Sequence, residues 1–189
     1  LRFELEYALE RGSTDNSFLF TQSNDVLNDN QSAVLVHPPG AIYTEIFLSK
    51  LKNELPNNCQ VLKVVVGHVN PNRVKFLKEL NKSYPNIELI TSNPGAKLIK
   101  ELWVQRKPTI QNNTSSKNTS SEYLLPAMQV IRQEQELKVN EKYNLKLIPS
   151  PTPRWPGGLI VFEEELGLLM SDKLFAAHIC TTRWAESNR

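Results

Sequence analysis

The segment that most constrains the fold is "QVLKVVVGH", residues 60–68, a continuous apolar run of strand length. A strand that is apolar at successive positions is typical of a parallel sheet covered on both faces. Residues 71–85, "PNRVKFLKELNKSYP", follow directly and have the apolar spacing of an amphipathic helix. We expect Asn70 to cap this helix and Pro71 to lie in its first turn. This strand–helix unit predicts α/β layering.

The segments around this unit predict further strands and helices. A helix is expected at residues 43–55, with an apolar stripe of Ile46, Phe47, Leu51 and Leu55. Strands of an antiparallel meander are expected before it, at residues 2–9, 16–22 and 32–40. A strand at 86–92 and a helix at 94–105 continue the α/β pattern. Four strand candidates follow, at residues 128–140, 144–151, 157–165 and 166–175, and the last two are joined by a hairpin turn. The order predicts a layered sandwich with helices outside.

One tract has no periodicity. Residues 105–122 are polar and rich in Asn, Ser and Thr, a composition that buries too little apolar surface to order itself. We interpret this tract as a low-complexity, exposed and mobile insertion. It is not a domain boundary, because strands resume after it. The 189 residues are long enough for one domain with a real core.

Composition excludes several function classes. Lys and Arg number 22 against 20 Asp and Glu, so no strong positive field favours nucleic acid or an anionic membrane. No apolar run approaches the roughly 20 residues of a membrane-spanning helix, and no signal-peptide pattern is present. Cys59 and Cys180 are far apart and form no CxxC, which favours two buried thiols in a reducing compartment over a disulfide or a metal pair. We expect a cytoplasmic location.

Local motifs for nucleophilic or phosphate chemistry are missing. The sequence contains no G-x-S-x-G elbow, no G-x-G-x-x-G and no Walker loop. "HPPG" and "SNPG" are interpreted as turns rather than phosphate-binding loops. His37, His68 and His178 are scattered, and each, taken alone, is better interpreted as a structural histidine than as part of a site.

Four polar loops follow apolar runs, where an α/β scaffold places its functional groups. They are "HPPG", "GHVNPNR", "PTPRWPGG" and "SDKLFAAH". Three of them contain a cation, namely Arg73, Arg154 and Lys173. Taken alone, each of these residues is better interpreted as a solvated surface charge. Trp155 and the two glycines after Pro156 indicate either a tight turn or a close approach to a ligand.

At these residues the sequence resembles a family. "LEYALERGSTDNSFLF", "VVVGHVNPNRVKFLKEL" and "IPSPTPRWPGGLIVFEEELGLLMSDKLFAAH" are similar to the diflavin flavoproteins of cyanobacteria, which are flavodiiron proteins. The resemblance implies a metallo-β-lactamase-like αββα sandwich of the α/β (α+β) class over residues 1–189, incomplete at its C-terminal end. It also implies flavodoxin-like and flavin-reductase modules downstream, which carry FMN and a second flavin.

The resemblance also assigns positions to the family's diiron ligands. The ligand loop of iron-binding members, His-x-Glu-x-Asp-His, corresponds to His68, Asn70, Asn72 and Arg73. The next two ligand positions, a His before Trp-Pro and an Asp two residues before Phe, correspond to Arg154 and Lys173. Of these six positions only His68 keeps a ligand, and a final His lies beyond this chain. Because Arg and Lys have no lone pair to donate at neutral pH, we expect no metal here.

The function implied by the resemblance is reduction of oxygen to water with NAD(P)H electrons, in photoprotective electron transfer. This domain would then act with an intact-site paralogue, as a homo- or hetero-oligomer in which head-to-tail pairing sets the flavin of the neighbouring subunit against Trp155 and His178. The alternative is a non-catalytic scaffold or regulatory subunit with a cationic anion-binding pocket. Hydrolysis by a metallo-β-lactamase mechanism is least favoured, because it needs a metal-bound hydroxide.

Overall fold

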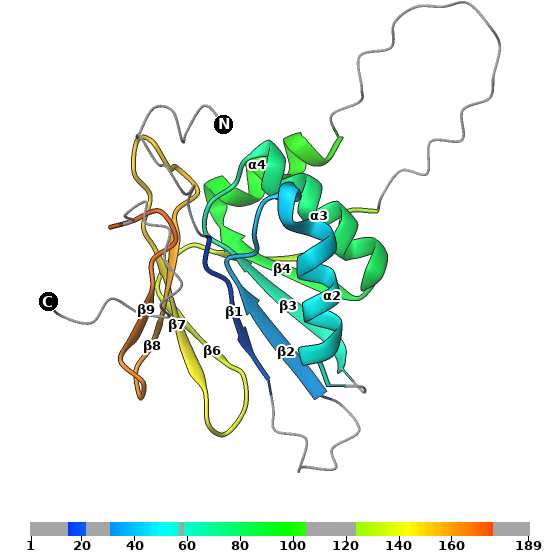
Figure 1. The fold of residues 1–189 in the computed structure, drawn as a ribbon. Coiled ribbons are helices and arrows are strands. Elements are labelled where there is room, and N and C mark those ends of the chain that lie inside the picture. Colours follow the sequence, from blue (N-terminus) through cyan, green and yellow to red (C-terminus); the bar gives the residue numbers. More distant parts are fainter. Residues whose placement is uncertain (1–14, 22–30, 57–58, 105–123, 176–189) are drawn as a thin grey trace, which may run out of the picture.

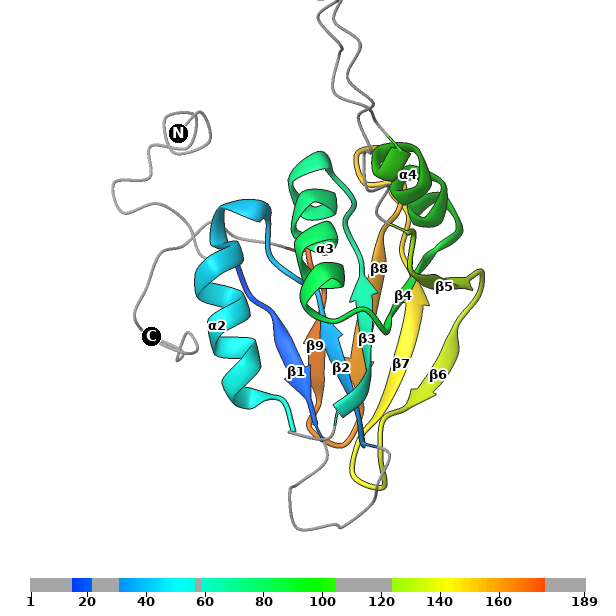
Figure 2. The same cartoon turned by 90° about the vertical axis from the view of Figure 1, so that its right-hand side faces the viewer.

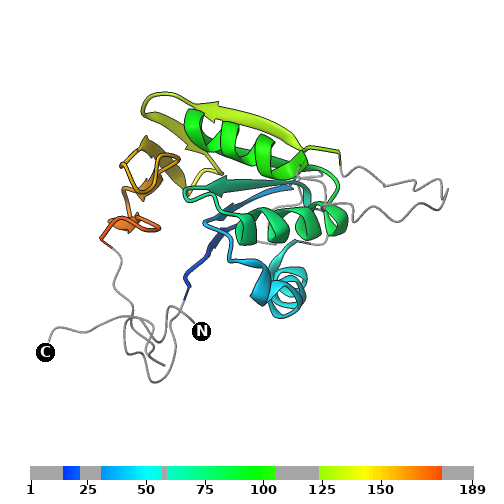
Figure 3. The ribbon, with the colours of Figure 1, turned by 90° about the horizontal axis from the view of Figure 1, so that it is seen from above.

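The computed structural model of the chain describes residues 15–21, 31–56, 59–104 and 124–175. These residues form a five-stranded sheet, a four-stranded sheet and a layer of helices. Figure 1 and Figure 2 show the helices on one face of the five-stranded sheet and the second sheet on its other face. From above, the two sheets lie in separate layers (Figure 3). The α/β (α+β) class is therefore confirmed, with all described helices on the first sheet.

The first sheet has the order β1-β2-β3-β4-β5. Its strands are β1 (Phe18–Phe20), β2 (Gln31–Val36), β3 (Cys59–Val66), β4 (Ile87–Ser92) and β5 (Ala127–Ile131). β1 pairs antiparallel with β2, whereas β2 to β5 run parallel to one another. Parallel strands place all their carboxyl ends at one edge of the sheet. That edge carries the loops discussed below.

The helical layer consists of the short 3₁₀ helix η1 (Ala41–Tyr43), α2 (Thr44–Glu54), α3 (Pro71–Ser83) and α4 (Asn93–Val104). α3 begins as predicted: the Asn70 side chain accepts a hydrogen bond from Arg73 N at 2.8 Å, and Pro71 is in the first turn. The predicted stripe of α2 is partly wrong. Leu51 is 3% exposed, but Ile46 is 66% exposed and faces away from the core.

β3 is covered on both faces, as its apolar run predicted. Val64 and Val66 pack in a cluster with the helices, and Val65 packs in a cluster with the second sheet; all three are fully buried. Full burial of a valine side chain is worth about 1.5–3 kcal/mol, so this strand contributes strongly to both cores. It also fixes the position of Gly67 and His68, which follow it directly.

The second sheet is antiparallel, with the order β6-β7-β8-β9. Its strands are β6 (Gln135–Lys138), β7 (Asn144–Pro149), β8 (Leu159–Glu163) and β9 (Leu168–Met170). The predicted single strand at 128–140 is wrong, because the chain leaves the first sheet after Ile131 and enters the second at Gln135. The predicted hairpin between the last two strands is confirmed as β8–β9.

Three features predicted from the sequence fall on residues that the structure does not describe. The strand predicted at 2–9, the insertion at 105–122 and Cys180 lie outside the described residues. Cys59 is half-buried at the start of β3, not fully buried as predicted, and it is a free thiol. In the described part of the chain no helix has the length and apolar character to cross a membrane.

Candidate functional site

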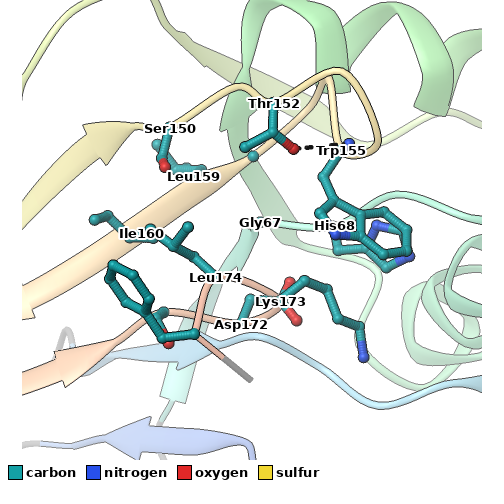
Figure 4. A pocket seen from close by; sticks show the side chains of 13 residues that line it. Gly67, His68, Ser150, Thr152, Trp155, Leu159, Ile160, Asp172, Lys173 and Leu174 are labelled. Carbon is teal, nitrogen blue, oxygen red and sulfur yellow. Dashed lines mark hydrogen bonds between the residues drawn. The ribbon is translucent and has the colours of Figure 1, made fainter. Parts of the chain in front are cut away.

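The polar loops meet at the carboxyl edge of the first sheet. His37 follows β2, and Gly67 and His68 follow β3. Two segments of the second sheet approach this edge: residues 150–158 between β7 and β8, and Asp172 just after β9. Figure 4 shows His68, Trp155, Asp172 and Lys173 around one hollow. Segments about 100 residues apart in sequence therefore build one site.

Asn70 links the start of α3 to His68. Its side-chain oxygen accepts from Arg73 N at 2.8 Å, so its amide nitrogen is left to donate to His68 Nε2 at 3.1 Å. Because an amide N–H can only donate, Nε2 must carry the lone pair of a neutral imidazole. Asn70 thus holds the ring by an interaction that a carboxylate at this position could not make.

His68 is held in its neutral form. Burial, and after it the charge of the Arg73 guanidinium, lower the pKa of its imidazole to about 4. Its ring meets the Trp155 ring edge to face, with centroids 4.3 Å apart and planes at 77°. At neutral pH the His68 imidazole that faces the hollow is therefore uncharged and packed against the Trp155 ring.

Arg73 is buried, and this corrects the view that it could be a solvated surface charge. It is 2% exposed. Its Nη1 donates to Asp172 Oδ2 at 2.7 Å and to the His68 carbonyl oxygen at 2.9 Å. A second donor, Nη2, lies 3.5 Å from Asp172 Oδ1, and the Asp15 carboxylate is 3.9 Å away. The guanidinium is thus neutralised inside the site.

Asp172 is a residue that the sequence analysis missed. Its side chain is 6% exposed. Burial alone would raise the pKa of its carboxyl, but the charges of Arg73 and His37 outweigh this and lower it. It therefore stays ionised. A weak signal existed in the sequence, since Asp172 precedes the predicted position Lys173, but nothing local shows that its partner is 99 residues away.

His37 completes this buried cluster. Its Nε2 donates to the Met170 carbonyl oxygen at 2.9 Å, so it joins the end of β2 to the end of β9. Its Nδ1 lies 3.8 Å from Asp172 Oδ2 and has no hydrogen-bond partner among the described residues. Burial lowers the pKa of this imidazole. A Cβ on Gly67 would lie 2.7 Å from His37 Cε1, so only glycine fits beside the ring.

The remaining predicted positions are spread around the site. Lys173 lines the same hollow as His68 and makes no hydrogen bond or ion pair among the described residues. Arg154 is exposed, and its guanidinium lies 5.2 Å from the centroid of the Trp155 ring. Asn72 is exposed in the first turn of α3. His178 lies outside the described residues.

His68 and Trp155 stand between two hollows. The smaller, about 190 Å³, is lined on one side by Lys173 and Asp172. The larger, about 560 Å³, extends over Asn70 and Arg154 toward α4. Both hollows contain His68 and Trp155 in their walls. The structure thus brings His68, Asn70, Arg73, Trp155 and Lys173 together, with Arg154 at the rim of the larger hollow.

These residues do not fit a diiron centre. Iron needs carboxylate oxygens and neutral imidazoles, yet a guanidinium lies beside His68 and already occupies the Asp172 carboxylate. No cluster of three or more His, Cys, Asp or Glu side chains suitable for a metal ion occurs in the described part of the chain. Among the predicted positions that the structure describes, His68 alone has a side chain of the imidazole or carboxylate type, and its Nε2 lone pair already accepts from Asn70.

Comparisons with known proteins agree with this architecture. No protein-family model matches the chain. Diflavin flavoprotein A 6 of Nostoc sp. is 35% identical over 100% of this chain, which covers 29% of that relative. The metal-soaked Flv1 flavodiiron core from Synechocystis sp. PCC6803 matches with a TM-score of 0.75 and 30% identity, over 99% of this chain and 40% of that one. The chain belongs to the flavodiiron protein family.

A second solved structure supports the same assignment. A fragment of diflavin flavoprotein A 5 from Nostoc sp. PCC 7120 has a TM-score of 0.71 and 30% identity, over 96% of this chain and 61% of that one. The family predicted from the motifs is thus confirmed, together with the flavodiiron-core fold. The chain spans less than a third of the length of the curated relative of 35% identity.

Proposed function

We propose that this flavodiiron domain is part of a flavoprotein that uses NAD(P)H electrons to reduce oxygen to water, in photoprotective electron transfer in the cytoplasm. The proposal assigns the domain a metal-free role beside a paralogue whose diiron site is intact. FMN and a second flavin would belong to flavodoxin-like and flavin-reductase modules downstream. One observation carries the proposal: the buried ion pair of Arg73 with Asp172 at 2.7 Å, in the middle of the predicted ligand positions.

The ion pair supports a metal-free role on electrostatic grounds. An iron ion next to His68 would compete with Arg73 for the Asp172 carboxylate, in a buried site where water screens charges poorly. The carboxylate of Asp172 could bind iron only by leaving that guanidinium unpaired, which is costly in a buried site. The residues present thus favour an internal ion pair over a bound cation.

Residues around the same site could form a packing surface for the flavin of a neighbouring subunit. Trp155 offers an aromatic face, and Arg154 lies against it at 5.2 Å. His68 stays neutral because its pKa is lowered to about 4. In the head-to-tail arrangement that the family resemblance implies, the isoalloxazine of the neighbouring subunit would pack on this wall, and these side chains would exclude water from it without taking part in electron transfer to a metal.

A second candidate function is a scaffold or regulatory subunit whose cationic pocket binds an anion. Lys173 favours it, because this ammonium lines the smaller hollow and makes no ion pair among the described residues. Arg154, which is exposed and lines the larger hollow, is a second cation. Arg73 does not contribute to such a pocket, since Asp172 neutralises its charge.

Oxygen uptake with and without this subunit distinguishes the two functions. The complete protein would be co-expressed with an intact-site paralogue from the same source, and NAD(P)H-dependent oxygen consumption would be measured. The first function predicts co-purification and a clear loss of uptake when this subunit is deleted. Unchanged uptake in its absence would contradict that function. Unchanged uptake accompanied by an anion-dependent change in assembly would instead support the second.

A further inference from the structure

The turn "SNPG", Ser92 to Gly95, has no role in the proposed function, yet it contacts the loop that carries Trp155. Ser92 is 2% exposed. Its hydroxyl donates to the Gly157 carbonyl oxygen at 2.8 Å and accepts from Gly95 N at 3.3 Å. A hydroxyl has one donor and two acceptor sites, so both bonds are possible at once. One side chain therefore joins the start of α4 to the loop at residues 150–158.

Two glycines let these segments touch backbone to backbone. A Cβ on Gly157 would lie 3.0 Å from Gly95 Cα and 3.3 Å from Gly95 N. A Cβ on Gly95 would collide with the Thr91 hydroxyl, which is itself fixed by a 2.8 Å bond to the Val66 carbonyl oxygen. Neither glycine can gain a methyl group without moving the loop or the helix start.

The loop itself is internally hydrogen-bonded. Trp155 N donates to both the hydroxyl and the carbonyl oxygen of Thr152, at 3.0 and 3.1 Å. Gly158 N donates to the Trp155 carbonyl oxygen at 3.0 Å, and Ser150 N donates to the Gly158 carbonyl oxygen at 2.9 Å. A loop with this many internal bonds moves as a unit. Its location is therefore set by the paired strands β7 and β8 at its two ends and by the segment against which it is docked.

We propose that Ser92, Gly95 and Gly157 form a positioning contact that sets where Trp155 stands beside His68. The loop docked by this contact carries Trp155, whose ring centroid lies 4.3 Å from that of His68. Shifting the loop would change the wall shared by the two hollows. Its value for flavin docking rests on the proposed function, whereas the positioning itself does not.

The test uses the complete chain labelled with 5-fluorotryptophan and observed by ¹⁹F NMR. The Trp155 signal is assigned by its absence in Trp155→Phe. Two variants disturb the contact: Ser92→Ala removes the hydroxyl, and Gly157→Ala inserts a methyl group against Gly95. Ser92→Thr keeps the hydroxyl and serves as the rescue. Gly40→Ala is the matched glycine control, because a Cβ there would meet only the Asn72 side chain, at an ordinary 3.7 Å.

The expected result is specific to one signal. Ser92→Ala and Gly157→Ala shift or broaden the Trp155 signal and the His68 ring-proton signals, which sense the Trp155 ring current. The Trp103 signal reports the fold through α4 and stays in place. Ser92→Thr and Gly40→Ala leave Trp155 unchanged.

An unchanged Trp155 signal in folded Ser92→Ala overturns the proposal. If Gly157→Ala does not fold, the comparison of Ser92→Ala with Ser92→Thr alone tests the positioning contact. The experiment contains no flavin, so a negative result here does not bear on the proposed function. Conversely, failure of the oxygen-uptake experiment leaves the positioning contact intact.

Discussion

The guanidinium of Arg73, at the start of α3, donates to the carboxylate of Asp172, just after β9, at 2.7 Å. This ion pair joins the two sheets at the edge where the predicted ligand positions gather. Both side chains are nearly inaccessible, at 3% and 6% exposure. Breaking one partner of a buried pair leaves an uncompensated charge, which makes the pair a structural element of the site.

Asp172→Asn should destabilise the domain. It keeps the size of the side chain but removes the charge that neutralises Arg73, so we expect the free energy of unfolding to fall by about 3 kcal/mol. Glu79→Gln is the matched control, because the Lys82–Glu79 pair has the same 2.7 Å separation on the exposed surface. There we expect a loss of about 1 kcal/mol or less. Equal losses in urea denaturation of the two variants would contradict this account.

Stability should decrease as the pH falls from 6.5 toward 4. The His68 pKa is about 4 in the folded protein against an ordinary 6.5, so in this window the unfolded chain binds the proton and the folded chain does not. Above pH 6.5 both states are neutral, and the dependence on His68 disappears. His37, whose pKa is also lowered by burial, acts in the same direction. Chemical denaturation across this range should show a reduced slope for His68→Gln; an identical slope would be evidence against a depressed His68 pKa.

Asn70→Asp should raise the pKa of His68. A carboxylate can still accept from Arg73 N, but it cannot donate to His68 Nε2, and its charge favours the imidazolium. We expect a rise of about one unit or more, measured by NMR titration of the His68 ring. Asn72→Asp is the control, since it adds the same charge in the same helical turn on an exposed residue. A pKa shift of equal size in both variants would mean that the Asn70 hydrogen bond does not set the pKa of His68.

Gly67→Ala should be tolerated much less than Gly40→Ala. The added Cβ of the first would lie 2.7 Å from His37 Cε1 and would collide with the Leu159 carbonyl oxygen. Overpacking of this kind costs about 1–3 kcal/mol. For Gly40→Ala, where the nearest atom is 3.7 Å away, we expect a change within about 0.5 kcal/mol. Thermal unfolding of the two variants measures the difference, and similar melting temperatures would contradict the close packing of His37 on Gly67.

Local patterns predicted the parts of the fold that local chemistry decides. The apolar run of β3 and the cap at Asn70 are determined within a few residues, and both were confirmed. The turn that divides residues 128–140 between two sheets was missed, because each half alternates like one strand. Ile46 was wrongly predicted for a related reason. Apolar spacing placed it on the stripe of α2, but spacing does not predict whether another element covers that position.

The site was predictable in composition but not in its contacts. His68, Arg73 and Lys173 were selected from their loops, yet an arginine in the first turn of a helix looks solvated in the sequence. Its burial depends on Asp172, which approaches from the other sheet. A partner so distant in sequence leaves no periodic signal. The positive pocket expected from three cations is therefore less positive, because one of them is neutralised.

Iron content tests the central claim most directly. The purified chain would be incubated anaerobically with ferrous iron, freed of unbound metal and analysed for iron, with an iron-binding member of the family loaded in parallel. A diiron site would take up about two iron atoms per chain. Because Arg73 and Asp172 are paired and only His68 remains as a ligand, we predict well below one iron atom per chain. A value of about two would contradict the account.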